Sequence, residues 1–155
     1  MLTQLPRTPR DTRGASRMAF AHTIRARYGE VDMQGVVFNA HWLTYFDDCA
    51  TRFFDWLGFA PKETFVSGGG FDFMLVKALV EWKGSAGFDD EIRIDVAPAR
   101  IGNSSFDLQY SSSVDGRPAC DARVTYVLIE PGTSRSREIP AELRSKLEGS
   151  RPRAT

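Results

Sequence analysis

Two periodicities of apolar residues divide the first half of this chain into a strand and a helix. In residues 22–28 apolar and polar residues alternate, which predicts a half-buried strand. In residues 40–57 apolar residues recur at three- and four-residue steps, which predicts a helix buried along most of its length. Asn39 is a favoured N-cap residue for this helix, and Gly58 can take the left-handed conformation that often ends one.

The pattern in the second half of the chain predicts an antiparallel meander. Strand-like runs with alternating apolar residues cover residues 71–82, 91–99, 105–114 and 119–130. The dipeptide Asp115–Gly116 between the last two runs is a strong hairpin signal. Pro140 can open a short helix that ends at Leu147. One strand, one long helix and a meander predict an α+β domain whose sheet curls around the helix.

The length and composition fit one domain with two polar ends. At 155 residues, with 42% hydrophobic residues and eleven Phe, the chain can build a single core. Residues 1–17 hold four Arg and one Asp, so we expect a disordered basic tail there. The domain is then expected over residues 18–148, followed by a polar tail over residues 149–155. Residues 60–70 end in three glycines, and no regular element is expected in this connector.

Charge and cysteine content argue against several classes of function. The formal net charge is zero, and without the basic tail the body is mildly acidic, which argues against a nucleic-acid surface. No apolar run is long enough to cross a bilayer, so we expect a soluble cytoplasmic protein with no membrane partner. Cys49 and Cys120 lie within apolar patterns and are expected to be reduced core residues. Two His and two Cys without ligand spacing predict no metal site.

Asp32 stands just before the predicted helix, in a loop that contains glycines. A helix N-terminus presents backbone N–H groups without intrahelical partners and a partial positive charge, which together can hold a developing oxyanion. Gly35 permits a sharp turn between Asp32 and Asn39, so a substrate carbonyl can lie between the carboxylate and the amides. An ionised carboxylate can attack this carbonyl or activate a water. So small a set of groups favours thioesters, because a thiolate departs readily.

The stretch RYGEVDMQGVVFNAHWLTYFDD, with its Asp-x-x-Gly-x-Val-aromatic pattern ahead of an aromatic helix, resembles the hotdog-fold acyl-CoA thioesterases of the 4-hydroxybenzoyl-CoA thioesterase family. The resemblance extends to IGNSSFDLQY, the Asp-Gly hairpin and REIPAELRSKLE, and it covers residues 21–148. It implies a helix wrapped by a five- to six-stranded antiparallel sheet. It also implies homodimers that pair their sheets edge to edge, often joined into homotetramers, with active sites at the dimer interface and no cofactor.

The resemblance also assigns roles to individual residues. It puts the catalytic carboxylate on Asp32, as nucleophile or general base, and the carbonyl-polarising backbone N–H on Asn39. The acyl-CoA substrate is expected to contact Gly35, Val37, Phe38, His41, Trp42 and Arg100. Many relatives carry His or Tyr in place of Phe38 and Asn39, and Tyr in place of Trp42, so the identity of the acyl group stays open.

Simpler roles are open for several of these residues. Asp32 can be a turn residue, because Asp is common in loops. Glu30 is expected to be a solvated loop acid, and His41 can be an exposed residue of the first helical turn. Asp47 and Asp48 fit the polar face of the helix.

Weaker candidates for substrate contact lie further along the chain. Cations for the phosphates of coenzyme A are expected first at Arg100 and then at Lys77 and Arg123, although surface Arg and Lys are usually only solvated. Residues that can line an acyl pocket, or belong to the core, are Phe65, Phe71 and Phe73. Cys49 has no recognisable base beside it, so core packing is preferred to a nucleophilic role.

Other functions compete with thioester hydrolysis. Hotdog folds also host hydratases and dehydratases, but those relatives rely on a His paired with an acid in a recognisable motif, which neither His22 nor His41 provides. A non-catalytic module that binds acyl-CoA or acyl-carrier protein is a second alternative, and a structural homo-oligomer is a third. The Asp-bearing glycine loop at the start of the helix favours an acyl-CoA thioesterase.

Overall fold

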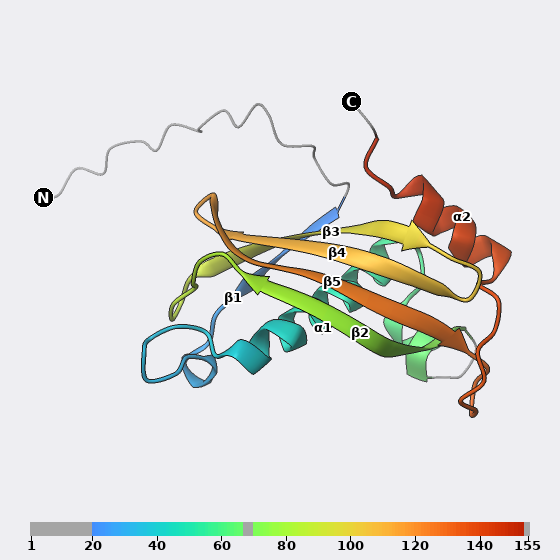
Figure 1. The fold of residues 1–155 in the computed structure, drawn as a ribbon, viewed down its shortest axis with the longest axis horizontal. Helices are drawn as coiled ribbons and strands as arrows, with labels where there is room; N and C mark the ends of the chain where they lie inside the picture. The colour runs from blue at the N-terminus through green and yellow to red at the C-terminus, as the bar shows by residue number, and fades with distance from the viewer. Residues whose placement is uncertain (1–19, 67–69, 154–155) are drawn as a thin grey trace, which may run out of the picture.

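One antiparallel sheet and one long helix make up the body of the protein (Figure 1). The computed structural model describes residues 20–66 and 70–153. In chain order the strands are β1 (Phe20–Arg25), β2 (Asp72–Trp82), β3 (Glu91–Ile101), β4 (Ser105–Val114) and β5 (Arg117–Ile129). They lie in the order β1-β3-β4-β5-β2, and every neighbouring pair is antiparallel. The predicted α+β class, a long helix against a five-stranded antiparallel sheet, is confirmed.

Helix α1 (Asn39–Trp56) lies across one face of this sheet (Figure 1). Its buried side chains are Trp42, Tyr45, Phe46, Cys49, Ala50, Phe53 and Phe54. The ring of Phe46 packs on the ring of Tyr110 in β4, with 4.9 Å between the centroids. Full burial of a Phe side chain contributes about 1.5–3 kcal/mol to folding, so this aromatic face anchors α1 to the sheet.

The two ends of α1 show one confirmed prediction and one that is wrong by a residue. Gly58 has a φ of +99°, the left-handed conformation expected after a helix C-terminus. At the other end the N-cap is Phe38, and Asn39 is the first helical residue. Phe38 makes no side-chain cap; its own N–H instead donates to the backbone carbonyl of Glu30 at 2.9 Å. The loop before the helix, rather than an Asn side chain, thus fixes where α1 begins.

Irregular pairing curves the sheet around α1. The strand register shifts between Leu75 and Lys77 in β2, between Pro98 and Arg100 in β3, and between Ser111 and Ser113 in β4. Each shift leaves an extra residue on one strand, which bends that strand and increases its local twist. The bent strands can therefore follow the surface of the helix and cover its wide apolar face.

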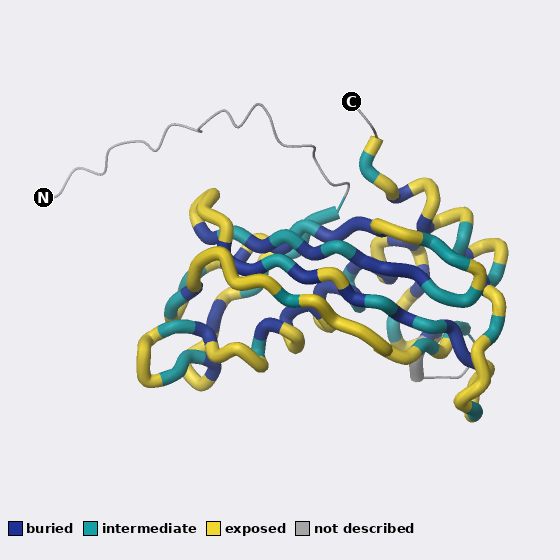
Figure 2. The backbone as a smooth tube through the Cα atoms, viewed as in Figure 1, coloured by how far each residue is buried: buried dark blue, intermediate teal, exposed yellow. Residues whose placement is uncertain are grey.

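Strand β2 forms one edge of the sheet and is exposed over most of its length (Figure 2). Its large apolar side chains with exposed fractions of 44–57% are Met74, Leu75, Val76, Leu79 and Trp82. An edge strand also presents backbone N–H and C=O groups that its own sheet does not pair. Strand β2 therefore combines free backbone hydrogen-bonding groups with exposed apolar side chains.

The connector after α1 is more regular than its sequence predicts. Residues Lys62–Val66 form a π-helical turn, although no element was expected between residues 60 and 70. The N–H of Thr64 donates to the carbonyl of Ala60 at 2.9 Å, and Thr64 is buried. Of the three glycines that motivated the prediction, Gly68 and Gly69 lie outside the described residues.

Helix α2 (Ala141–Gly149) packs beside β3 through the buried side chains of Leu143 and Leu147. Ser150 follows the helix, is itself buried, and donates from its hydroxyl to the carbonyl of Leu147 at 2.9 Å. The folded body thus reaches into the expected polar tail, while the expected basic tail over residues 1–17 lies outside the described residues. Within the described part of the chain, no helix has the length and apolar character needed to span a membrane.

Candidate active site

The loop that carries Asp32 is a tight hairpin held by its own backbone. The N–H of Asp32 donates to the carbonyl of Val36 and the N–H of Gly35 donates to the carbonyl of Asp32, both at 2.9 Å. Gly35 has a φ of +76°, which a glycine adopts without strain. The N–H of Gln34 donates to Oδ1 of Asp32 at 2.8 Å, and this contact orients the carboxylate.

The start of α1 presents backbone donors beside this hairpin. The N–H of His41 donates to the carbonyl of Phe38 at 3.0 Å. Asn39 and Ala40 precede His41, so their N–H groups have no helical carbonyl one turn earlier to bind. Phe38, Asn39 and Ala40 are exposed. These N–H groups and the positive end of the helix dipole can together stabilise an oxyanion.

A short antiparallel ladder connects the hairpin to the helix. Val31 and Val37 form an isolated β-bridge, and the neighbouring N–H of Phe38 donates to the carbonyl of Glu30. Asp32 follows Val31 at one end of this ladder, and Asn39, the first residue of α1, follows Phe38 at the other end. The ladder therefore ties the Asp32 hairpin to the start of α1, and the approach of the Asp32 carboxylate to the N–H of Asn39 stays a prediction.

Glu30 ties this ladder to α1, and its role was missed from the sequence. Expected to be solvated, the residue is only 6% exposed. Its carboxylate accepts hydrogen bonds from the backbone N–H of Arg27 at 2.9 Å, from Nε of Arg27 at 2.7 Å and from the hydroxyl of Tyr45 at 2.5 Å. Burial alone raises the pKa of Glu30, but the hydrogen bonds from Arg27 and Tyr45 outweigh burial and lower the pKa to about 2.

Two sequence signals could have pointed to this contact. Tyr45 lies on the apolar face of α1, and a buried Tyr hydroxyl usually finds a hydrogen-bond partner. Arg27 and Glu30 are three residues apart, and residues 28–30 form a 3-10 turn that brings them together. The partner of the Tyr hydroxyl still could not be named, because only the folded chain brings residue 30 against residue 45.

Most of the predicted substrate contacts gather at this end of α1. Gly35 and Phe38 are exposed, and the ring of the half-buried His41 packs edge-on against Phe38, with 6.2 Å between the centroids. Val37 and Trp42 are 4% and 1% exposed, so they support the loop and the helix start from the core. Gly35, Phe38 and His41 thus lie at or near the surface at the start of α1, and their contact with a substrate stays a prediction.

Arg100 lies apart from these residues. The connection that leads into β3 lies beside the Asp32 loop, where Val36 and Gly87 form an isolated β-bridge, and Arg100 is near the other end of β3. Its guanidinium donates to Ser105 Oγ at 3.0 Å and to Asp107 Oδ1 at 2.9 Å. Within one protomer Arg100 is thus remote from the loop, and its predicted contact with coenzyme A stays a prediction.

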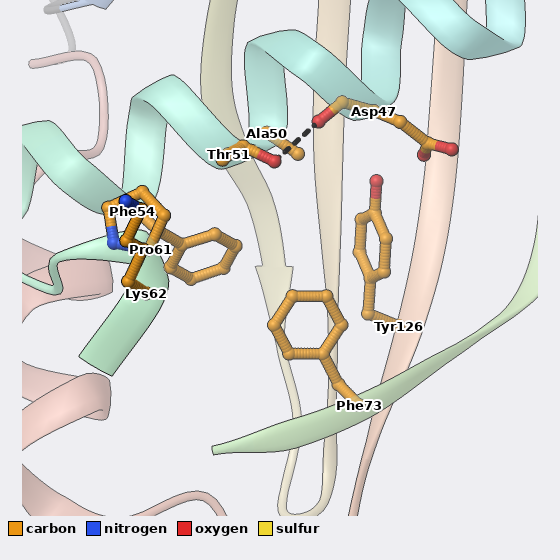
Figure 3. A pocket seen from close by; sticks show the side chains of 8 residues that line it. All are labelled: Asp47, Ala50, Thr51, Phe54, Pro61, Lys62, Phe73 and Tyr126. Atoms are coloured by element: carbon orange, nitrogen blue, oxygen red, sulfur yellow. Dashed lines mark hydrogen bonds between the residues drawn. The ribbon is translucent and has the colours of Figure 1, made fainter. Parts of the chain in front are cut away.

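A pocket of about 400 Å³ opens between α1, the π-helical turn and strands β2 and β5 (Figure 3). Its lining residues are Asp47, Ala50, Thr51, Phe54, Pro61, Lys62, Phe73 and Tyr126. Figure 3 shows the rings of Phe54, Phe73 and Tyr126 around the pocket, with the side chain of Asp47 on the same side as the hydroxyl of Tyr126. Phe73 thus lines a pocket, one of the two roles considered for it from the sequence.

Burial raises the pKa of polar groups in and behind this pocket. The hydroxyls of Tyr110 and Tyr126 lie 2.8 Å apart, and burial raises the pKa of both. Partial burial of its carboxyl group also raises the pKa of Asp47, although the residue as a whole is exposed. The pocket therefore combines aromatic walls with a carboxyl group that can accept or share a hydrogen bond.

Phe71 and Cys49, two further candidates, have structural roles. Phe71 packs against Phe59, with 4.7 Å between the ring centroids, and the side chain of Phe65 lies outside the described residues. Cys49 is fully buried, and burial raises its pKa to about 12, which makes the thiol a poor nucleophile. The described residues contain no group of three or more His, Cys, Asp or Glu side chains arranged to hold a metal.

Comparison with known families decides the class of this protein. The family model of the thioesterase-like superfamily matches residues 26–147. The chain belongs to this superfamily. The match includes the Asp32 hairpin, all of α1 and the residues that line the pocket. The thioesterase class implied by the sequence resemblance is therefore confirmed.

Individual thioesterase-like relatives are similar over nearly their whole length. The 1,4-dihydroxy-2-naphthoyl-CoA hydrolase of Synechococcus elongatus is 22% identical over 122 residues, which cover 79% of this chain and 90% of the relative. The solved structure of BH1999 gentisyl-coenzyme A thioesterase aligns with a TM-score of 0.74 at 21% identity, over 83% of this chain and 99% of that one. The PA5185 protein from Pseudomonas aeruginosa aligns with a TM-score of 0.78 at 24% identity, over 89% and 95% of the two chains. These structural similarities confirm the hotdog fold.

Proposed function

We propose that this thioesterase hydrolyses an acyl-CoA to the free acid and coenzyme A, with Asp32 as the reacting carboxylate. The backbone N–H of Asn39 is the proposed oxyanion donor. The observation that carries this proposal is the short ladder before α1, because it ties the Asp32 hairpin directly to a helix start whose backbone N–H groups have no helical partner. A thioester carbonyl between the two groups meets a nucleophile or base on one side and donors on the other.

The reaction needs few groups beyond these two. In the general-base route, Asp32 takes a proton from a water whose oxygen attacks the thioester carbon, and the carbonyl oxygen becomes negative beside the N–H of Asn39. The C–S bond then breaks, and the thiolate of coenzyme A leaves and takes up a proton. In the nucleophilic route, Asp32 itself attacks the thioester carbon, the C–S bond breaks and the thiolate leaves and takes up a proton; water then hydrolyses the resulting anhydride to the free acid and restores the Asp32 carboxylate.

Strand β2 supports a homodimer that pairs two sheets edge to edge. Two identical edge strands related by a two-fold axis pair antiparallel, and the pairing would satisfy backbone groups on both edges. The same contact would cover the exposed apolar side chains of Met74, Val76 and Leu79. An extended sheet across two subunits therefore explains why β2 carries apolar side chains on an open edge.

Antiparallel pairing would also combine the two halves of the active site. The pocket lies near Phe73 at the start of β2. Beyond the other end of β2, the carbonyl of Ala86 accepts the N–H of Val37 in the Asp32 loop at 2.8 Å. In the dimer the start of one β2 faces the end of the other, so the pocket of one subunit approaches the Asp32 loop of its partner. The acyl group then enters the pocket while its thioester lies at the loop.

The pocket favours an aromatic acyl group that carries a hydroxyl. The rings of Phe54, Phe73 and Tyr126 can pack against an aromatic ring. The carboxyl group of Asp47 can bind a hydroxyl on that ring. Two of the relatives are named for thioesters of hydroxylated aromatic acids, dihydroxynaphthoyl-CoA and gentisyl-CoA, which supports the same substrate class here.

Release of free thiol from a panel of acyl-CoAs tests the proposal. The panel contains hydroxybenzoyl-CoA, unsubstituted benzoyl-CoA and an aliphatic acyl-CoA of similar size. The hydroxylated substrate is expected to have the highest kcat/KM, about 10-fold above benzoyl-CoA, because its hydroxyl gains a hydrogen bond in the pocket. The Asp32→Asn variant is expected to lower kcat by about 10²- to 10⁴-fold, the usual contribution of a positioned acid or base.

A matched control separates this effect from a general loss of charge. Asp55→Asn removes a carboxylate at the other end of α1, where Asp55 lies 3.7 Å from Arg52, and it should leave kcat unchanged. Full activity of Asp32→Asn would refute the mechanism. Absence of turnover for every acyl-CoA would refute the proposed function, and equal rates across the panel would refute the substrate class.

A further inference from the structure

We infer that Glu30 is a positioning residue for the proposed reaction. Its side chain binds Tyr45 in the second turn of α1, and its backbone carbonyl binds Phe38 at the N-cap of the same helix. Through these contacts Glu30 sets the distance between the carboxylate of Asp32 and the N–H groups at the helix start. The inference rests on the proposed function of this site and adds a residue that neither reacts nor touches the substrate.

The geometry of the carboxylate separates positioning from catalysis. Oε1 accepts Nε of Arg27 at 2.7 Å and Nη2 of Arg27 at 2.5 Å. Oε2 accepts the backbone N–H of Arg27 at 2.9 Å and the hydroxyl of Tyr45 at 2.5 Å. Both oxygens are occupied by donors from the protein, and the residue is buried, so Glu30 is poorly placed to attack a thioester or to take a proton from water.

The clamp, defined as the contacts of Glu30 with Arg27, Tyr45 and Phe38, holds the loop directly to α1. The hairpin has other ties, from Val37 to Ala86 and from Val36 to Gly87, but these run to the connection between β2 and β3. They fix the hairpin to the sheet, the Val31–Val37 bridge closes the hairpin on itself, and the clamp adds the side-chain contact to the second turn of α1. Loosening the clamp is therefore expected to change the relation of the carboxylate to the oxyanion donors without unfolding the domain.

Small displacements at this place have large kinetic effects. An oxyanion donor acts when it lies about 2.7–3.1 Å from the oxygen that becomes charged. A misplacement of about 1 Å can cost about 10²-fold in rate. Binding of the acyl group depends on the pocket near β2, which no residue of the clamp lines, so loss of the clamp should lower kcat much more than it changes KM.

Steady-state hydrolysis of the preferred acyl-CoA by four variants tests the inference. Glu30→Gln and Tyr45→Phe are each expected to lower kcat by about 10- to 100-fold with KM within about twofold of wild type. Tyr45→Phe removes only the hydroxyl and retains the ring that packs against Trp42, so it tests the same contact with little risk to folding. Glu30→Asp keeps the charge and should recover part of the kcat that Glu30→Gln loses.

The matched control removes a similar ion pair at the other end of the sheet. Glu130 follows β5 and lies 2.9 Å from Arg135, and both side chains are largely exposed. Glu130→Gln should leave kcat and KM at the wild-type values. Wild-type kcat in both Glu30→Gln and Tyr45→Phe would overturn the inference while the Asp32 mechanism stands. A rise in KM with unchanged kcat would also overturn it, because that result marks a binding contact.

Amide hydrogen exchange supplies a readout that does not depend on turnover. The N–H groups of Asp32 and Phe38 are hydrogen bonded in the hairpin and the ladder, and both should exchange faster in Glu30→Gln than in wild type. Unchanged exchange overturns the inference whether or not any acyl-CoA is hydrolysed. If wild type hydrolyses no acyl-CoA, the proposed function fails, and faster exchange in Glu30→Gln still supports the clamp.

Discussion

A single buried carboxylate organises the residues around the proposed active site. Glu30 is ionised where burial opposes its charge, because Arg27 and Tyr45 supply hydrogen bonds that water would otherwise make. Asp32, only two residues later, differs in both respects. It is half-buried, and its carboxylate accepts one hydrogen bond from the loop. In the proposed reaction, Glu30 thus supports the loop while Asp32 is available to react.

The acid stability of the protein is expected to depend on Glu30. Its pKa falls from the usual 4.5 to about 2 on folding, so its contribution is present above about pH 4.5 and is lost as the pH falls towards 2. At neutral pH, Glu30→Gln should lower the free energy of unfolding by on the order of 2–3 kcal/mol. Urea denaturation at a series of pH values should show this difference shrinking between pH 4.5 and 2. A difference that stays constant across this range would contradict the assignment.

At the scale of elements, α1 is the part of the fold that depends most on packing. Phe46 is 1% exposed and stacks on Tyr110, so Phe46→Ala should lower the free energy of unfolding by about 3–5 kcal/mol. Leu43 lies on the same helix with 38% exposure, and Leu43→Ala should cost much less. Chemical denaturation of both variants measures the contrast. Equal losses of unfolding free energy in the two variants would mean that the buried apolar face of α1 contributes no more to stability than its exposed side.

The elements were more predictable from sequence than the site they build. The apolar period of α1 and the Asp115–Gly116 turn, with φ values of +50° and +78°, depend on local pattern and could be inferred. The start of α1 was misplaced by one residue because a distant carbonyl, that of Glu30, binds the N–H of the N-cap residue. The pocket near Phe73 and the buried state of Glu30 depend on contacts between separate elements, which no local pattern encodes.

At the scale of the whole molecule, the proposed dimer makes each active site a product of two subunits. Asp32→Asn subunits have an intact pocket, and Thr51→Trp subunits, whose pocket is filled, have an intact carboxylate. Each variant alone should be nearly inactive. Refolding an equal mixture should give half mixed dimers, each with one complete site, and so about a quarter of wild-type activity.

The outcome of this mixing experiment depends on which subunit supplies the pocket. If the pocket serves the carboxylate of its own subunit, neither mixed site is complete and no activity returns. Thiol release before and after refolding of the mixture measures the difference. Wild-type protein taken through the same refolding step is the control for recovery.

The β-bulge at Val76, in the middle of β2, affects which strands can pair with this edge of the sheet. Register is lost between Leu75 and Lys77, so Val76 bends the strand away from a straight path. A flat strand from an unrelated protein cannot match this bend along its length, whereas a second copy carries the same bend and can match it by symmetry. In the proposed dimer, this bend would favour a second copy of the chain over an unrelated strand and would limit amyloid-like stacking at the exposed edge.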